Sequence, residues 1–148
     1  MDFTTTTPEW LDTFTCNMIH LMLESEGVGL AAPQVGQNIR VMVLDIGRSY
    51  PIVAVNPVLT YDSEHPTEED WEGCLSFPGV AVKRARHTVA HLSYQTVRGE
   101  PSELNLSDFP ARVAQHEMDH LDGIHFGTGA SWLKRQELAK KVQKSLRR

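Results

Sequence analysis

The sequence has little of what a membrane-bound, secreted or disulfide-stabilised protein requires. Its 148 residues contain no run of about 18 apolar residues, and the first dozen contain no Lys or Arg. We therefore expect no membrane span, no membrane partner, no secretory signal and no organellar transit peptide. Only two cysteines occur, Cys16 and Cys74, and a domain of this size does not need a disulfide. A reducing, cytoplasmic location is the resulting expectation.

The remaining composition is that of one globular domain extending over residues 1–148. Hydrophobic residues make up 41% of the chain and charged residues 22%, which excludes a disordered or fibrous class. The net charge of -5 is unevenly distributed. Residues 131–148 contain seven Lys and Arg against one acidic residue, whereas the rest of the chain contains seven against eighteen. We expect a basic tail on an acidic body.

Periodicity and punctuation predict an α+β fold. The first helix is capped by Thr7, has Pro8 at its first position and ends before Gly27. The second begins near Asp108 and Pro110 and ends at Leu121, and the third extends from Ser131 to the end of the chain. Strands are predicted over 39–46, 52–55 and 88–94, with an acidic loop or edge over 62–70. We expect a mixed, mostly antiparallel sheet around the second helix, with a helix at each end of the chain.

The second predicted helix has two unlike sides. At 100° per residue, one side collects two imidazoles, a carboxylate and one valine, and the opposite side is apolar. The first side is formed by Val113, His116, Glu117 and His120, and the second by Ala111, Ala114, Met118 and Leu121. Such a helix is expected at the centre of the fold and is a suitable place for chemistry.

The segment from His116 to His120 matches the HExxH pattern of metal-dependent hydrolases. Imidazoles four residues apart lie one helical turn apart and can bind the same ion. Glu117 then lies beside the metal, where it suits a general base acting on a water whose pKa a divalent ion lowers toward about 7. A chance match or a structural metal site is the alternative interpretation of this short pattern.

The third ligand separates the classes of HExxH protein. The metzincin register requires a histidine at position 126, where this chain has Phe126, and His125 lies one position early. Thermolysin-like enzymes use a later glutamate, but Glu137 lies in the basic tail. Cys74 remains, preceded by Gly73, and a three-ligand site with one open position is typical of a catalytic metal.

Three segments together resemble the signature motifs of the peptide deformylases. They are Gly-Val-Gly-Leu-Ala-Ala-Pro-Gln-Val-Gly at 27–36, Glu-Gly-Cys-Leu-Ser at 72–76 and Gln-His-Glu-Met-Asp-His-Leu-Asp-Gly at 115–123. The resemblance covers the chain from about residue 17 to the C-terminal helix. It implies a metal-dependent hydrolase that removes the N-formyl group from the formyl-methionine of nascent peptides and releases formate.

The resemblance also implies a role for each site residue. Cys74, His116 and His120 would hold one divalent metal ion per chain, with Fe2+ as the native ion and Zn2+, Ni2+ or Co2+ as substitutes. Glu117 would move the proton. The Gln34 side-chain amide and the Leu75 backbone N–H would form the oxyanion hole.

The resemblance further implies how substrate binds. Gly29 would let a peptide pair with its segment as an added strand. Val28 and Val113 would line the pocket for the leading methionine, although plain core roles are an equal alternative for both valines. Formyl-methionyl nascent peptides are thus the expected partners.

Two other functions and one further partner stay open at this point. The rival functions are a zincin-like endopeptidase and a non-catalytic, metal-stabilised binding module. The basic C-terminal helix is either a solvated helix or a contact with ribosomal RNA, and no DNA partner is expected.

Overall fold

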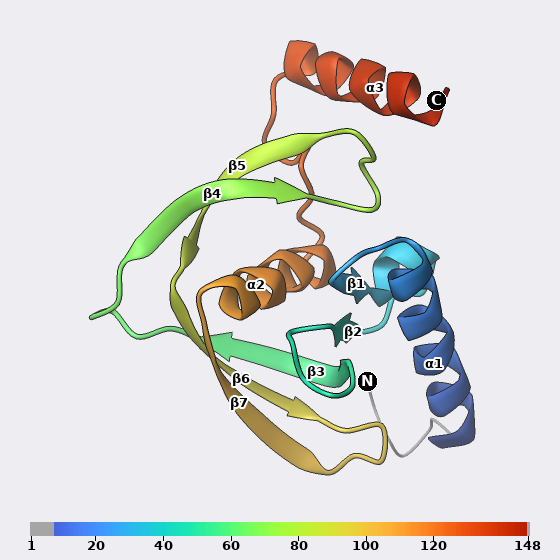
Figure 1. Cartoon of the computed structure of the whole chain (residues 1–148), viewed down its shortest axis with the longest axis vertical. Coiled ribbons are helices and arrows are strands. Elements are labelled where there is room, and N and C mark those ends of the chain that lie inside the picture. The colour runs from blue at the N-terminus through green and yellow to red at the C-terminus, as the bar shows by residue number, and fades with distance from the viewer. Residues whose placement is uncertain (1–7, 148) are drawn as a thin grey trace.

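The structure is a computed structural model that describes residues 8–147 (Figure 1). The elements in chain order are α1 (Pro8–Glu24), β1 (Gly29–Ala31), the 3-10 helix η1 (Ala32–Val35), β2 (Val41–Leu44), β3 (Ile52–Thr60), β4 (Thr67–Gly73), β5 (Ala81–His87), β6 (Val89–Gln95), β7 (Pro101–Ser107), α2 (Phe109–Leu121) and α3 (Trp132–Leu146). The predicted α+β class is confirmed. The predicted cap Thr7 lies outside the described residues.

The strands form two antiparallel sheets. The larger has the order β1-β2-β3-β6-β7, and the smaller pairs β4 with β5. The β3–β6 register shifts between Val55 and Val58, where Asn56 has a φ of 48° and is followed by Pro57, which has no N–H to donate. The side-chain amide of Asn56 donates to Gln95 on β6 at 2.8 Å and supports this bulge.

At β2 the larger sheet is buried on both faces, because alternate side chains of this strand pack against different helices. On β2, Met42 and Leu44 pack into a core cluster with α2, whereas Val41 and Val43 pack into a second cluster with α1. All four of these side chains are fully buried. Each such burial stabilises the fold by roughly 1.5–3 kcal/mol.

Helix α2 lies between the two sheets, and α3 lies outside the smaller one (Figure 1). The side chain of Gln115 fixes α2 to β5, since it accepts from the His87 N–H at 2.9 Å and donates to the His87 carbonyl at 2.8 Å. Helix α3 docks through Leu138 and Val142 onto a small apolar cluster that includes Val80. The HExxH segment is therefore enclosed between layers.

Several strands differ from the sequence-based expectations. Strand β2 is shorter than the predicted 39–46, β3 is longer than 52–55, and β1, β5 and β7 were not predicted. The acidic segment over 62–70 ends in β4, whose residues up to Trp71 are exposed, as expected of an edge. All three predicted helices are present. Across residues 8–147, none of the helices combines the length and apolar composition that crossing a membrane requires.

Candidate metal centre

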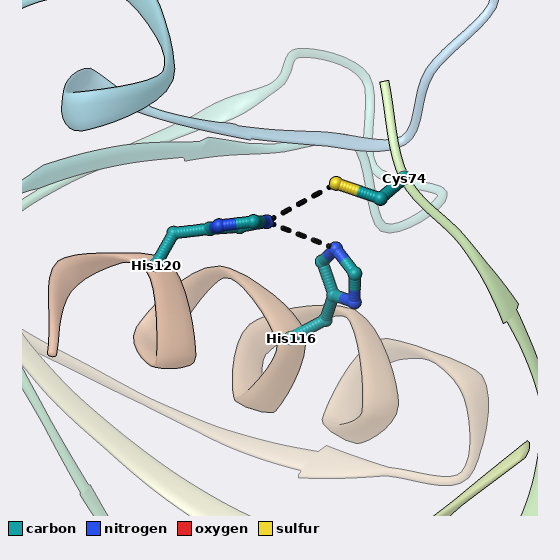
Figure 2. Close-up of side chains that lie close together, drawn as sticks. All are labelled: Cys74, His116 and His120. Carbon is teal, nitrogen blue, oxygen red and sulfur yellow. Dashed lines mark hydrogen bonds between the residues drawn. The ribbon is translucent and has the colours of Figure 1, made fainter. Parts of the chain in front are cut away.

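Three of the residues singled out from the sequence converge between α2 and the end of β4. His116 and His120 project from successive turns of α2, and Cys74 follows directly after β4 (Figure 2). Cys74 Sγ lies 3.3 Å from His120 Nε2, and His120 Nε2 lies 3.2 Å from His116 Nε2. The three ligand atoms all lie within 4.8 Å of one another, which brings them close enough to bind one ion.

The donor set fits a catalytic divalent metal. One thiolate and two imidazoles suit Fe, Co, Ni or Zn and leave a coordination position open. The tautomer of His116 also fits, because its Nδ1 lies 3.0 Å from Glu72 Oε1. With a metal bound, an Nδ1–H donated to this carboxylate would leave the Nε2 lone pair free to bind the ion between Cys74 and His120.

Glu72 connects His116 to a buried ionic network that ties α2 to the smaller sheet. Arg86 donates to both of its carboxylate oxygens at 2.9 Å, and Arg112 donates to Oε2 at 2.7 Å. Arg86 also donates to Asp119 at 2.6 Å. Burial alone would raise the pKa of Glu72, but the hydrogen bonds from His116, Arg86 and Arg112 outweigh it and lower this pKa to about 2. Glu72 is therefore a fixed anion.

The candidate ligand residues perturb one another's protonation. Burial acts to raise the pKa of the Cys74 thiol, but hydrogen bonds with His116 and His120 outweigh it and lower this pKa to about 6. Burial acts to lower the pKa of His116, but its hydrogen bonds with Cys74 and Glu72 raise it to about 10. These pKa values describe a thiolate beside a protonated imidazole. A metal cation that bound here would take the place of the imidazole proton and release it.

Glu117 lies next to the three candidate ligands and is not part of their cluster. Its side chain is buried, and Oε2 has no hydrogen-bond partner in the structure. Burial raises the pKa of Glu117 to about 7. A Cβ added to Gly29 would lie only 2.5 Å from Glu117 Oε1, so the carboxylate packs directly on the backbone of β1. A buried carboxyl with one unpaired oxygen beside a metal site suits proton transfer.

Gln34 is held with its amide nitrogen toward the metal ligands. Its Oε1 accepts from the Ala31 N–H at 2.8 Å, and its Nε2 donates to Ser76 Oγ at 2.9 Å and to Cys74 Sγ at 3.6 Å. Fixing both ends of the amide preorganises its N–H groups. Leu75, the other predicted oxyanion donor, directly follows Cys74.

A cavity of about 520 Å³ opens onto this centre. Val28, Gly29, Val113 and Leu75 are among its lining residues, together with Cys74, His116, Glu117 and Gln34. Val113 also belongs to the core cluster of α2, whereas the side chain of Val28 is exposed. Of the predicted site residues, only His120 is not part of the cavity lining.

Comparison with known proteins assigns this chain to a family. Residues 1–136 match the family model described as polypeptide deformylase. The chain belongs to the polypeptide deformylase family. The peptide deformylase of Thermotoga neapolitana is 47% identical over 107 residues, 72% of this chain, and the chain spans 64% of that relative's length. Peptide deformylase 2 of Xanthomonas axonopodis pv. citri is 38% identical over 146 residues, 97% of this chain and 85% of the relative.

Solved structures agree with the family assignment. A crystal structure of a peptide deformylase from Legionella pneumophila has a TM-score of 0.85 and 36% identity over 97% of this chain and 85% of that one. The deformylase family is metal-dependent, and this membership favours a deformylase over the zincin-like endopeptidase.

The polar residues that pack around the candidate metal centre were not predicted from the sequence as parts of the site. Glu72 lies inside one of the motif segments, but its contacts with Arg86 and Arg112 join positions 14 and 40 residues apart. A signal was present, because side chains two residues apart on a strand point to the same side, and Glu72 lies two residues before Cys74. Ser76, which accepts from Gln34, lies in the turn after Cys74, where strand alternation does not apply and could not have predicted the contact.

Proposed function

We propose that this chain removes the formyl group from the amino end of formyl-methionyl peptides. In this proposal Cys74, His116 and His120 hold one divalent metal ion, and Glu117 moves the proton. The observation that carries the proposal is the convergence of Cys74, His116 and His120 beside a buried carboxyl group with one unpaired oxygen, in a cavity large enough for a peptide end.

The proposed chemistry is hydrolysis of a formamide. A bound divalent ion supplies Lewis acidity and lowers the pKa of water toward about 7. Glu117 accepts a proton from the attacking water, whose oxygen forms the new bond to the formyl carbon. Glu117 then donates this proton to the amine nitrogen as the carbon–nitrogen bond breaks. Formate and a free amino terminus leave the site.

Two N–H donors are proposed to stabilise the negative charge that develops on the formyl oxygen during the reaction. Gln34 Nε2 already lies within hydrogen-bonding distance of a ligand atom, Cys74 Sγ, so it faces the reacting region. The Leu75 backbone N–H belongs to the peptide bond that joins Cys74 to Leu75. Removing one such donor typically costs a factor of about 10²–10³ in turnover.

Substrate is proposed to bind as an added strand along β1. This strand pairs with β2 on one side and is at the end of the larger sheet. The absence of a side chain at Gly29 leaves Glu117 next to the backbone with which a peptide would pair. Val28 and Val113, which both line the cavity, are proposed to contact the leading methionine.

The test is release of formate from a formyl-methionyl-alanyl peptide by protein purified without oxygen, with metal analysis of the same sample. Deformylation without cleavage of internal peptide bonds supports the proposal. Internal cleavage of casein, or no turnover by the metal-loaded protein, would refute it. We propose ferrous iron as the native ion. If the metal analysis found mainly zinc or nickel, that metal would be assigned as the native ion instead.

Replacing Cys74 with Ser is expected to lower metal retention, because an alcohol is a poor substitute for a thiolate toward a late first-row divalent ion. The metal-to-protein ratio after gel filtration measures the effect. Cys16→Ser is the matched control, since Cys16 is exposed on α1 and is not in the candidate metal cluster. Equal metal content in Cys74→Ser and Cys16→Ser would remove Cys74 from the ligand set.

We also propose that α3 contacts the ribosome. Its Lys and Arg side chains are exposed, its Leu138 side docks onto the body, and the rest of the chain is acidic. A basic surface on an acidic protein increases encounters with a polyanion such as ribosomal RNA.

Replacing Lys140, Lys141 and Lys144 together with Glu should weaken cosedimentation with ribosomes. For each phosphate that the variant no longer neutralises, the slope of log affinity against log salt should also fall by about one. Turnover on a free formyl peptide should not change. A variant with Arg48→Glu and Arg98→Glu, two exposed positions outside α3, serves as control. Equal ribosome binding by both variants would leave α3 as a structural helix.

A further inference from the structure

The two histidines of the candidate metal centre are held in different ways. His116 lies in the interior of α2, and its Nδ1 lies 3.0 Å from Glu72 Oε1. His120 lies one residue before the end of α2 at Leu121. Within residues 8–147, both side-chain hydrogen bonds of His120 involve Nε2, the atom that points toward the other two candidate ligands (Figure 2). Because the ends of helices fray, the position of His120 depends on how firmly the end of α2 is held.

The last carbonyls of α2 are satisfied in two ways. The Ile124 N–H donates to the Asp119 carbonyl at 2.7 Å, and the Gly123 N–H donates to the His120 carbonyl at 3.2 Å. Gly123 has a φ of 77°, so these two bonds form the Schellman arrangement in which many helices end. Among the described residues, no backbone N–H donates to the carbonyl of Leu121, the last residue of the helix.

Arg40 supplies the donor for this carbonyl from the neighbouring sheet. Its Nη1 donates to the Leu121 carbonyl at 3.2 Å and to Asp122 Oδ1 at 3.0 Å, and its Nη2 lies 3.3 Å from Met118 Sδ. The positive guanidinium also lies at the negative end of the α2 dipole, where the carboxylate of Asp122 alone would be unfavourable. One side chain thus contacts three positions at the end of α2.

The backbone of Arg40 is fixed by the larger sheet. Arg40 directly precedes β2, whose four side chains are fully buried, and its carbonyl accepts from the Asn56 N–H at 2.8 Å. Arg40 therefore connects a rigid strand to the turn of helix that carries His120. The Arg40 side chain is 44% exposed, so its replacement leaves the packing of the core in place.

We propose that Arg40 is a positioning residue for the metal centre, because it holds the end of α2 and with it the backbone of His120. Glu72 contacts His116 directly, whereas Arg40 acts on the second imidazole through the Leu121 peptide. Arg40 lies outside the three motif segments at 27–36, 72–76 and 115–123. This inference rests on the metal site of the proposed function and does not depend on which reaction the site performs.

The test replaces Arg40 with Met, an unbranched side chain that removes every donor. The probe is Co2+, whose visible absorption changes with the number and geometry of its ligands. Arg40→Met should weaken Co2+ binding, measured by competition with a chelator, by about tenfold, the lower end of the range for residues that support metal ligands. It should also shift the Co2+ spectrum. Arg40→Lys, which restores a charged donor, should recover most of the loss.

Arg48→Met is the matched control, since Arg48 is exposed in the loop between β2 and β3. Urea unfolding of the metal-free proteins separates positioning from stability. If Arg40→Met lowered the unfolding midpoint but kept the Co2+ affinity and spectrum of wild type, Arg40 would be merely structural and the inference would be overturned. An equal loss of affinity in Arg48→Met would overturn it as well.

The same experiment distinguishes this inference from the proposed reaction. Wild-type protein that binds Co2+ but releases no formate would refute deformylation, and the comparison of Co2+ binding would still decide the role of Arg40. Wild-type protein that binds no Co2+ would overturn both the metal site and the positioning role.

Discussion

Glu117→Gln should lose about 10²–10⁴-fold of the deformylation rate while the protein keeps its metal. This range is typical of removing a general acid–base group. An amide of the same shape cannot accept the proton of water and then return it to the amine, so both halves of the proposed reaction fail. The measurement is kcat on a formyl-methionyl peptide, together with the metal-to-protein ratio, because Glu117 lies beside the ligand cluster and is not a member of it.

The same substitution should leave the fold as stable as before, or more stable. Glu117 is 4% exposed, and its Oε2 has no hydrogen-bond partner, so a buried group that is costly to ionise is replaced by a neutral one. Thermal unfolding of both forms measures this. Glu103→Gln is the control, since the side chain of Glu103 is 73% exposed on β7, far along the sheet order from β1. Retained turnover in Glu117→Gln, or metal loss that accounts for the defect, would contradict the proposed role.

The sequence was most informative where chemistry and periodicity coincide. One turn of helix separates His116 from His120, so a four-residue spacing is sufficient to predict that both face one ion. Helix α3 was predicted from Ser131, whose side chain accepts from the Lys134 N–H at the start of the helix. Local rules of this kind need no information about distant partners.

The smaller sheet was harder to predict because its inward side chains are charged. On β5 the inward-facing series is Val82, Arg84 and Arg86, and arginines in such positions hide the apolar alternation by which strands are recognised. Arg86 is tolerated there only because Glu72 and Asp119 accept its hydrogen bonds, and both partners are distant in sequence. Strand β7, in contrast, carries a signal for a strand, since Leu104 and Leu106 alternate with polar residues.

The network around Glu72 should therefore support both the fold and the metal. In Glu72→Gln, the neutral amide cannot accept from Arg86, Arg112 and His116 together, and its own NH₂ would face their donors. Breaking a buried ion pair by removing one partner typically costs about 3–5 kcal/mol. Removing the partner that fixes a ligating histidine typically lowers metal affinity by about 10–100-fold.

Two measurements separate these effects of Glu72→Gln. Urea unfolding of the metal-free protein reports the ionic network alone, and competition with a chelator reports the affinity of the folded site. We expect losses in both, because Glu72 holds the arginines that join α2 to the smaller sheet and also the Nδ1–H of His116. Glu103→Gln, whose partner His91 is on the surface, should change neither. If Glu72→Gln lost stability but bound metal as tightly as wild type, orientation of His116 by α2 alone would be sufficient.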